Sequence, residues 1–182
     1  MPGYAIPESW SSTRWIGSIC YFGTALACLY WWLRDRSYLR SYPESSRLAP
    51  VLTCMELLLC LDMLFEWRLL AHSWFAELFL ERNLYNGRRG LQLGLLSALA
   101  LFLLLALRAS YRHFRGRRGA TLASSGLCLS LTLYAMEIIS MHETDHALYH
   151  LVSGVMVIAY LWALSCALTF AGAMIEARSG RR

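Results

Sequence analysis

Five long apolar stretches limit what this chain can fold into more than any other feature of its sequence. They cover residues 15–33, 48–67, 90–107, 120–141 and 148–174. Each approaches the roughly 20 residues that a helix needs to cross a hydrocarbon layer of about 30 Å. A content of 57% hydrophobic and only 16% charged residues lies outside the usual range of soluble domains. The sequence therefore predicts an all-α, polytopic membrane helical bundle with about five transmembrane helices, forming a single integral membrane domain over residues 1–182.

The fourth and fifth stretches must be separated by a reversal of the chain. One continuous helix over residues 120–174 would be about 80 Å long at 1.5 Å per residue, which exceeds the thickness of any bilayer. The polar interruption between them is the segment 140–145. Thr144 or Asp145 is a suitable N-cap there, so we expect the fifth helix to begin directly after this segment.

Arginine supplies all of the basic charge, because the sequence contains 17 arginines and no lysine, a usage associated with GC-rich bacterial genomes. Twelve arginines flank one set of span ends and five flank the other. By the positive-inside rule, this distribution predicts a multi-pass protein of the bacterial cytoplasmic (inner) membrane with its N-terminus outside and its C-terminus cytoplasmic. The arginines lie in short blocks rather than on one continuous basic face, so we expect no nucleic-acid partner.

Three of the five histidines lie within nine residues, at His142, His146 and His150. On a helix, His146 and His150 would lie one turn apart, close enough to bind one metal ion, and His142 could approach the same point. His72 and Glu66, near the end of the second stretch, are expected on the same side of the membrane and could add ligands. The candidate ion is zinc or iron, and the sequence does not decide between them.

Acidic residues beside these histidines are candidates for catalysis. In a hydrolase, Glu137 or Asp145 would transfer a proton while the metal polarises a water molecule. A di-iron site in a bundle usually takes a Glu-x-x-His pair from each of two helices, and the sequence contains no such pair. The competing interpretation is that these histidines and acids are solvated residues of a turn that pair with one another.

The segment from His146 to Gly154, HALYHLVSG, resembles the start of the last helix in alkaline ceramidases and adiponectin-receptor-like membrane hydrolases. The resemblance covers nine residues of 182 and implies a zinc-binding HxxxH pair and hydrolysis of a lipid amide. Those families have seven helices and take a third histidine, a serine and an aspartate from early helices. Here five helices are predicted, and the second stretch offers Asp62, Glu66 and His72 without the matching serine spacing.

Charged residues inside or just after the second stretch suggest a different function. Glu56, Asp62, Glu66 and Arg68 occur there, and such groups often pair with other helices at a subunit interface. If the helix continued through them, Asp62 and Glu66 would share one face, while Arg68 and His72 would share another. That separation argues against a single polar channel along the second helix.

Small residues indicate where helices can pack closely. Ala163, Ala167 and Ala171 form a stripe at four-residue spacing on the fifth stretch, which predicts close helix contact there. The six cysteines all lie in apolar stretches without a CxxC pair, as expected for packing residues.

Two functions from different classes follow from these features. We expect an accessory, assembly or interaction subunit of a membrane system, with the lipid bilayer and other membrane subunits as its partners. The alternative is a metal-dependent, zinc-type intramembrane hydrolase that acts on a lipid or another membrane-embedded substrate. The sequence leaves open whether the protein is an enzyme.

Overall fold

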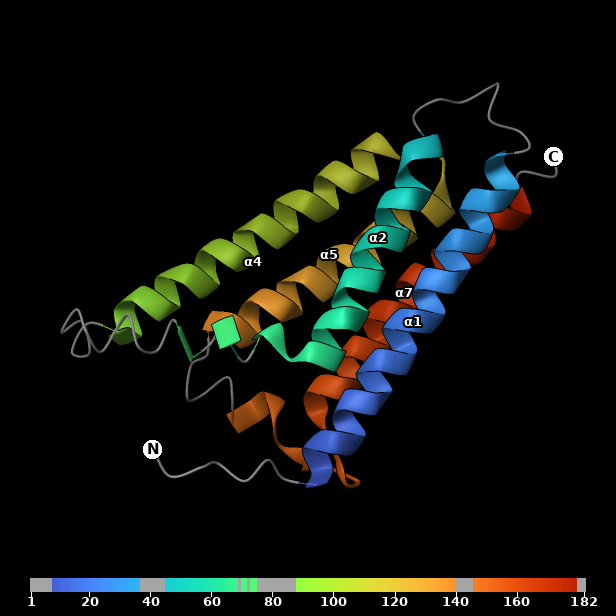
Figure 1. Cartoon of the computed structure of the whole chain (residues 1–182). Coiled ribbons are helices and arrows are strands. Elements are labelled where there is room, and N and C mark those ends of the chain that lie inside the picture. Colours follow the sequence, from blue (N-terminus) through green and yellow to red (C-terminus); the bar gives the residue numbers. More distant parts are fainter. Residues whose placement is uncertain are drawn as a thin grey trace.

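In a computed structural model of the chain, the described residues form five long helices and one short hairpin (Figure 1). The structure describes residues 8–36, 45–68, 70–71, 73–74, 88–139 and 146–179. The helices are α1 (Glu8–Arg36), α2 (Ser45–Phe65), α4 (Arg88–His113), α5 (Arg118–Ile139) and α7 (Val157–Ser179), and the hairpin pairs β1 (Leu151–Val152) with β2 (Val155–Met156) in antiparallel register. All five helices are long and apolar enough to cross a membrane. The chain is a multi-pass, all-α membrane protein, as the sequence predicts.

Four of the helices form a bundle, and α4 lies along one side of it (Figure 1). Helix α1 packs against α2 and α7, α5 packs against α7, and α4 packs mainly against α5. In each of the four bundle helices, between 39 and 44% of the most apolar segment is buried inside the protein. In α4, only 6% of the corresponding segment is buried. Helix α4 therefore presents most of its surface to whatever surrounds the bundle.

Contacts near the helix ends show that α5 and α7 are antiparallel. Gly119, at the start of α5, lies against Gly172 near the end of α7. Glu137, near the end of α5, accepts a hydrogen bond from Trp162 near the start of α7. The predicted reversal between the fourth and fifth spans is confirmed, although the segment 140–145 lies outside the described residues.

The fifth span begins nine residues later than predicted, at Val157 rather than Leu148. A short helical piece at residues 146–148 is followed by the hairpin. The hairpin turn is Ser153-Gly154, and φ is positive at both residues (53° and 81°), as a type I′ turn requires. Because the helix stops here, His146 and His150 do not occupy successive turns of one helix, and that part of the prediction is wrong.

The closest helix contact lies between α5 and α7 and depends on glycine. A Cβ atom at Gly126 would lie 2.6 Å from the backbone oxygen of Ser165 and from the backbone nitrogen of Thr169. A Cβ atom at Gly119 would lie 2.7 Å from the backbone oxygen of Gly172. The helices therefore pack backbone to backbone on this face. The predicted stripe at Ala163, Ala167 and Ala171 lies on a more exposed face of α7.

Candidate functional site

A cluster of buried charged residues lies where α2, α5 and α7 meet. Asp62 lies near the end of α2, Arg68 lies just beyond it, and Glu137 lies near the end of α5. At most 4% of any of these three side chains is exposed. Burial of charges at this depth is very unfavourable unless each finds a partner, so their contacts decide what the cluster can do.

A break in the second helix brings Arg68 back to Asp62. Helix α2 ends at Phe65, and Glu66 adopts the left-handed conformation with a φ of 57°, which is strained for a residue with a side chain. The backbone N–H of Arg68 then donates to Asp62 Oδ1 at 2.9 Å, and its Nε donates to Asp62 Oδ2 at 2.5 Å. The prediction that Asp62 and Arg68 lie on different helix faces is wrong because Glu66 interrupts the helix, and residues 67–68 are helical only after this break.

The same guanidinium also binds α5. Arg68 Nη1 donates to both carboxylate oxygens of Glu137, at 2.8 and 2.9 Å. Trp162 of α7 donates its indole N–H to Glu137 Oε1 at 3.1 Å. The guanidinium carbon lies 5.0 Å from the ring centroid of Trp162 and 5.5 Å from that of Tyr134, both within the range of a cation–π contact. Arg68 thus connects the end of α2 to α5 and α7.

Electrostatics keep this arginine charged. Burial lowers the pKa of the Arg68 guanidinium, but its attraction to Glu137 and Asp62 outweighs burial and raises the pKa above its ordinary value. The cluster holds two carboxyl groups around one guanidinium. Removal of the guanidinium would leave both carboxyl groups without their counter-ion in the interior of the bundle.

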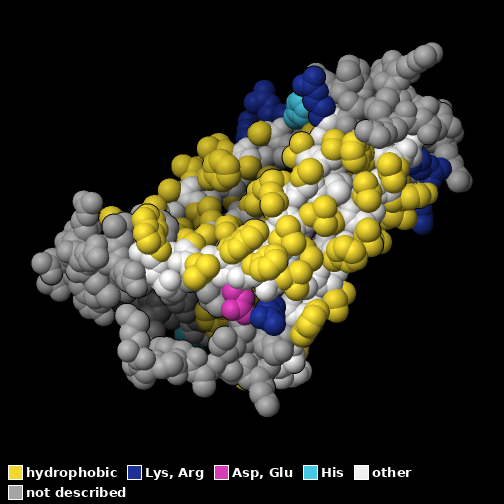
Figure 2. Space-filling view, in the orientation of Figure 1, with side chains coloured by type: hydrophobic (Ala, Val, Ile, Leu, Met, Phe, Trp, Pro, Cys, Tyr) yellow, Lys and Arg dark blue, Asp and Glu magenta, His cyan; other side chains and the backbone are white. Residues whose placement is uncertain are grey.

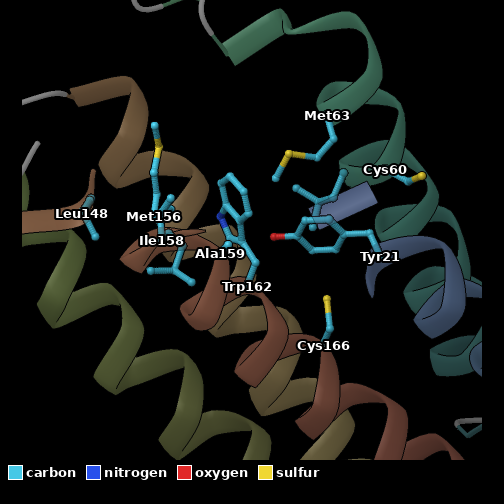
Figure 3. Close-up of a cluster of buried hydrophobic side chains, with 11 residues drawn as sticks. Tyr21, Cys60, Met63, Leu148, Met156, Ile158, Ala159, Trp162 and Cys166 are labelled. Atoms are coloured by element: carbon cyan, nitrogen blue, oxygen red, sulfur yellow. The ribbon is translucent and has the colours of Figure 1, made fainter. Parts of the chain in front are cut away.

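Hydrophobic side chains enclose the cluster. Figure 3 shows the Trp162 ring with Tyr21 and Met63 on one side and Met156 on the other, and the Tyr21 hydroxyl points toward the indole. Leu148 belongs to the same group of buried hydrophobic side chains. The hairpin segment and the end of α2 therefore meet at one end of the bundle, which is the juxtaposition that the sequence predicts for the two polar segments.

A second ion pair lies nearer the surface at this end. Arg14 of α1 donates from Nη1 to Glu66 Oε1 at 2.6 Å, and the two side chains are 32% and 27% exposed. Glu66, a candidate metal ligand in the sequence, is held here by an arginine. Figure 2 shows an acidic and a basic side chain side by side at the edge of a largely hydrophobic surface.

The structure locates only some of the predicted site residues. His146 and His150 are exposed, and both carboxylate oxygens of Glu137 are bound by Arg68. Within the described ranges, no group of three or more histidine, cysteine or acidic side chains could hold a metal ion. The remaining candidates, His72, His142 and Asp145, lie outside the described residues. The metal site and the catalytic roles of Glu137 and Asp145 stay predictions.

Glu56 is a further buried acid, deeper in the bundle than the cluster. Its side chain is fully buried, and neither carboxylate oxygen has a hydrogen-bond partner in the described part of the chain. The nearby Thr169 hydroxyl donates to the backbone oxygen of Ser165 at 3.2 Å. Among the described residues, no arginine forms an ion pair with Glu56.

Trp162 was not among the residues predicted for the site, yet it contacts both Arg68 and Glu137 at the centre of the cluster. An aromatic donor early in the fifth span, opposite an acid late in the fourth, could have indicated the pairing. Comparisons with known proteins give no further guide, because no protein-family model, curated protein or solved structure matches the chain at a significant level.

Proposed function

We propose that this chain is an accessory or interaction subunit of a bacterial inner-membrane system, and that α4 binds its partner. The observation that carries the proposal is the pair Gly90 and Gly94, a GxxxG motif in an apolar helix. A Cβ atom at either glycine would meet no described atom within 4 Å. GxxxG motifs allow two transmembrane helices to approach closely, and this one contacts no described part of its own chain.

The burial of α4 supports the same conclusion. Its most buried residue, Gln92, faces the bundle and donates to the backbone oxygen of Ile139 at 3.4 Å. Gly90, Gly94, Ser97 and Leu101 follow one another at three- or four-residue spacing and are all exposed. A glycine inside a helix is about 1 kcal/mol less favourable than alanine. Two such glycines on an exposed face are explained by a partner helix with small residues on its facing side.

The buried ionic residues are assigned to the interior of the subunit. Asp62 and Arg68 were both expected to pair with another protein, but they pair with each other, and Arg68 also pairs with Glu137. Glu66 pairs with Arg14. The partner contact is therefore proposed on α4 and not on the charged residues of α2.

We place the N-terminus outside and the C-terminus in the cytoplasm of a bacterial inner membrane. The support is the excess of arginine near one set of span ends. Arg108 near the end of α4 and Arg178 near the end of α7 lie on this arginine-rich side. Reporter fusions at the two termini test the assignment.

Site-specific photo-cross-linking in the native membrane tests the proposed function. A photoreactive side chain at Ser97, on the exposed face, should cross-link one defined membrane protein, whereas the same group at Leu99, on the more buried side, should not. Gly94→Leu should abolish the cross-link. Gly23→Leu is the matched control, because a side chain at Gly23 on α1 also meets no described atom within 4 Å. Equal loss in both leucine variants, or cross-linking only to lipid or to a second copy of the chain, would contradict the proposal.

A zinc-type intramembrane hydrolase is the second candidate. The observation in its favour is that His146 and His150 are exposed at the end of the bundle that bears the charged cluster. Metal analysis of the purified protein separates the two functions. Stoichiometric zinc or iron that disappears when both histidines are replaced by alanine would favour the hydrolase over the subunit.

A further inference from the structure

A basic hollow lies at the end of α4 that is farthest from Gly90 and Gly94. It is lined by Arg108, Tyr111, Arg112 and Arg115 and has a volume of about 550 Å³. All four residues are exposed. In the part of the chain that the structure describes, no carboxylate forms an ion pair with any of these three arginines.

The neighbouring arginine behaves differently. Arg117 pairs with Glu176 of α7, and Glu176 Oε1 also accepts the backbone N–H of Ala120 at 3.0 Å in the first turn of α5. That acid therefore neutralises one arginine and caps a helix. No described carboxylate compensates the positive charge of the hollow, which makes the hollow attractive to an anion.

The chemistry of the hollow suits a phosphate group. Guanidinium groups present planar pairs of N–H donors that match two phosphate oxygens at once. Arg108, Arg112 and Arg115 are spaced by four and three residues, so their side chains project from one side of the helix. The Tyr111 hydroxyl adds one more donor at the same level.

Exposed leucines continue the same face toward the bilayer. Leu101, Leu104 and Leu105 precede Arg108 by one to two helical turns, and they are 58%, 64% and 56% exposed. Figure 2 shows basic side chains gathered at one end of a surface that is otherwise largely hydrophobic. A free phosphate ion would use only the arginines, whereas a phospholipid would contact both the arginines and the leucines.

We propose that the hollow lined by Arg108, Tyr111, Arg112 and Arg115 binds the phosphate headgroup of an anionic phospholipid, whose acyl chains lie along Leu101, Leu104 and Leu105. The headgroup site lies at the opposite end of α4 from Gly90 and Gly94, and of the residues proposed for the two sites they share only Leu101. Basic sites on the cytoplasmic side of transmembrane helices are suited to anionic headgroups in this way.

Lipid binding to the purified full-length protein tests the proposal. The affinity for phosphatidylglycerol is measured in detergent for the wild type and for the double variant Arg108→Gln/Arg112→Gln. The control is Arg47→Gln/Arg178→Gln, which removes the same charge from two exposed arginines on other helices. Because charge-assisted hydrogen bonds to phosphate are lost, we expect the first variant to bind about tenfold more weakly and the control to bind within about twofold of the wild type.

Competition experiments identify the source of the phosphate. Phosphatidylcholine should bind more weakly than phosphatidylglycerol, and millimolar inorganic phosphate should not displace the lipid. Equal weakening in the two double variants, equal binding of the two lipids, or displacement by inorganic phosphate would each overturn the proposal. Helix content by circular dichroism confirms that each variant is folded.

Discussion

The four-helix bundle and α4 are both built from apolar helices, yet among the described residues the bundle is held by many specific contacts and α4 by few. In the bundle, Arg68 joins α2 to Glu137 of α5, and Gly126 brings α5 against α7 without room for a side chain. Helix α4 has leucines in abundance but little of its surface buried. Because lipid tails are as apolar as leucine, hydrophobicity drives helices into the membrane but does not select their neighbours. Buried polar pairs and small residues make that selection.

Removal of the Arg68 guanidinium is expected to have the largest effect on stability. Arg68→Met leaves Asp62 and Glu137 without a counter-ion inside the bundle, and we expect a loss of about 3–5 kcal/mol in the free energy of unfolding. Denaturant titration in detergent micelles, followed by helix content, measures the change. Adding Asp62→Asn and Glu137→Gln to the variant removes the stranded charges and should restore part of the stability. A triple variant no more stable than Arg68→Met would show that the loss arises from packing alone.

A pair of glycine substitutions compares the two regions directly. Gly126→Ala places a Cβ atom 2.6 Å from the backbone of α7, so we expect a loss of about 1–3 kcal/mol. Gly94→Ala meets no described atom within 4 Å and raises helix propensity, so we expect no loss and a gain of up to about 1 kcal/mol. Thermal unfolding in the same detergent measures both. Similar losses at the two positions would mean that α4 packs as closely as the bundle helices.

The sequence predicted the spans and the reversal well because both depend on composition over long windows. An apolar stretch of about 20 residues has few alternatives to a transmembrane helix. Two spans that are joined by a short connection must also run in opposite directions. Neither inference needs knowledge of which side chains meet.

The sequence did not predict the hairpin or the ionic cluster, because both depend on local breaks in helices. The Ser153-Gly154 pair is a recognisable turn signal, but it follows an HxxxH spacing that favours a helix. No local signal forces Glu66 into a left-handed conformation, which is retained because Arg68 gains Asp62 and Glu137 as partners. A tertiary contact of this kind cannot be read from helical periodicity.

Small residues show the same limit. The alanine stripe at positions 163, 167 and 171 has the regular spacing of a packing face, yet the close contact uses Ser165, Thr169 and Gly172. The GxxxG pair on α4 is equally regular and contacts no described part of the chain. Spacing therefore identifies faces that could pack, and the structure is needed to show which of them do.

Within the bundle, the indole of Trp162 tests a single hydrogen bond. Trp162→Phe keeps an aromatic ring near Arg68 but removes the N–H that binds Glu137 Oε1. We expect a loss of about 1.5 kcal/mol, the lower end for a hydrogen bond to a charged group, because Arg68 still binds the carboxylate. In a Glu137→Gln background the tryptophan change should have about half this effect, because a neutral amide oxygen is a weaker acceptor than a carboxylate. An equal effect in both backgrounds would assign the loss to ring packing.

The smallest effect is expected at the outer ion pair, which sharpens the comparison between buried and exposed charge at one end of the bundle. Arg14 and Glu66 are 32% and 27% exposed, so Arg14→Gln should lower the free energy of unfolding by only roughly 0.2–1 kcal/mol. The difference from the wild type should shrink in high salt, because solvent ions screen partly exposed pairs more strongly than buried ones. Unfolding measured at low and high ionic strength checks both points, with Arg68→Met as the salt-insensitive reference. A salt-independent loss as large as that of Arg68→Met would mean that Arg14, by holding Glu66 in its left-handed conformation, sets the turn that brings Arg68 to Asp62.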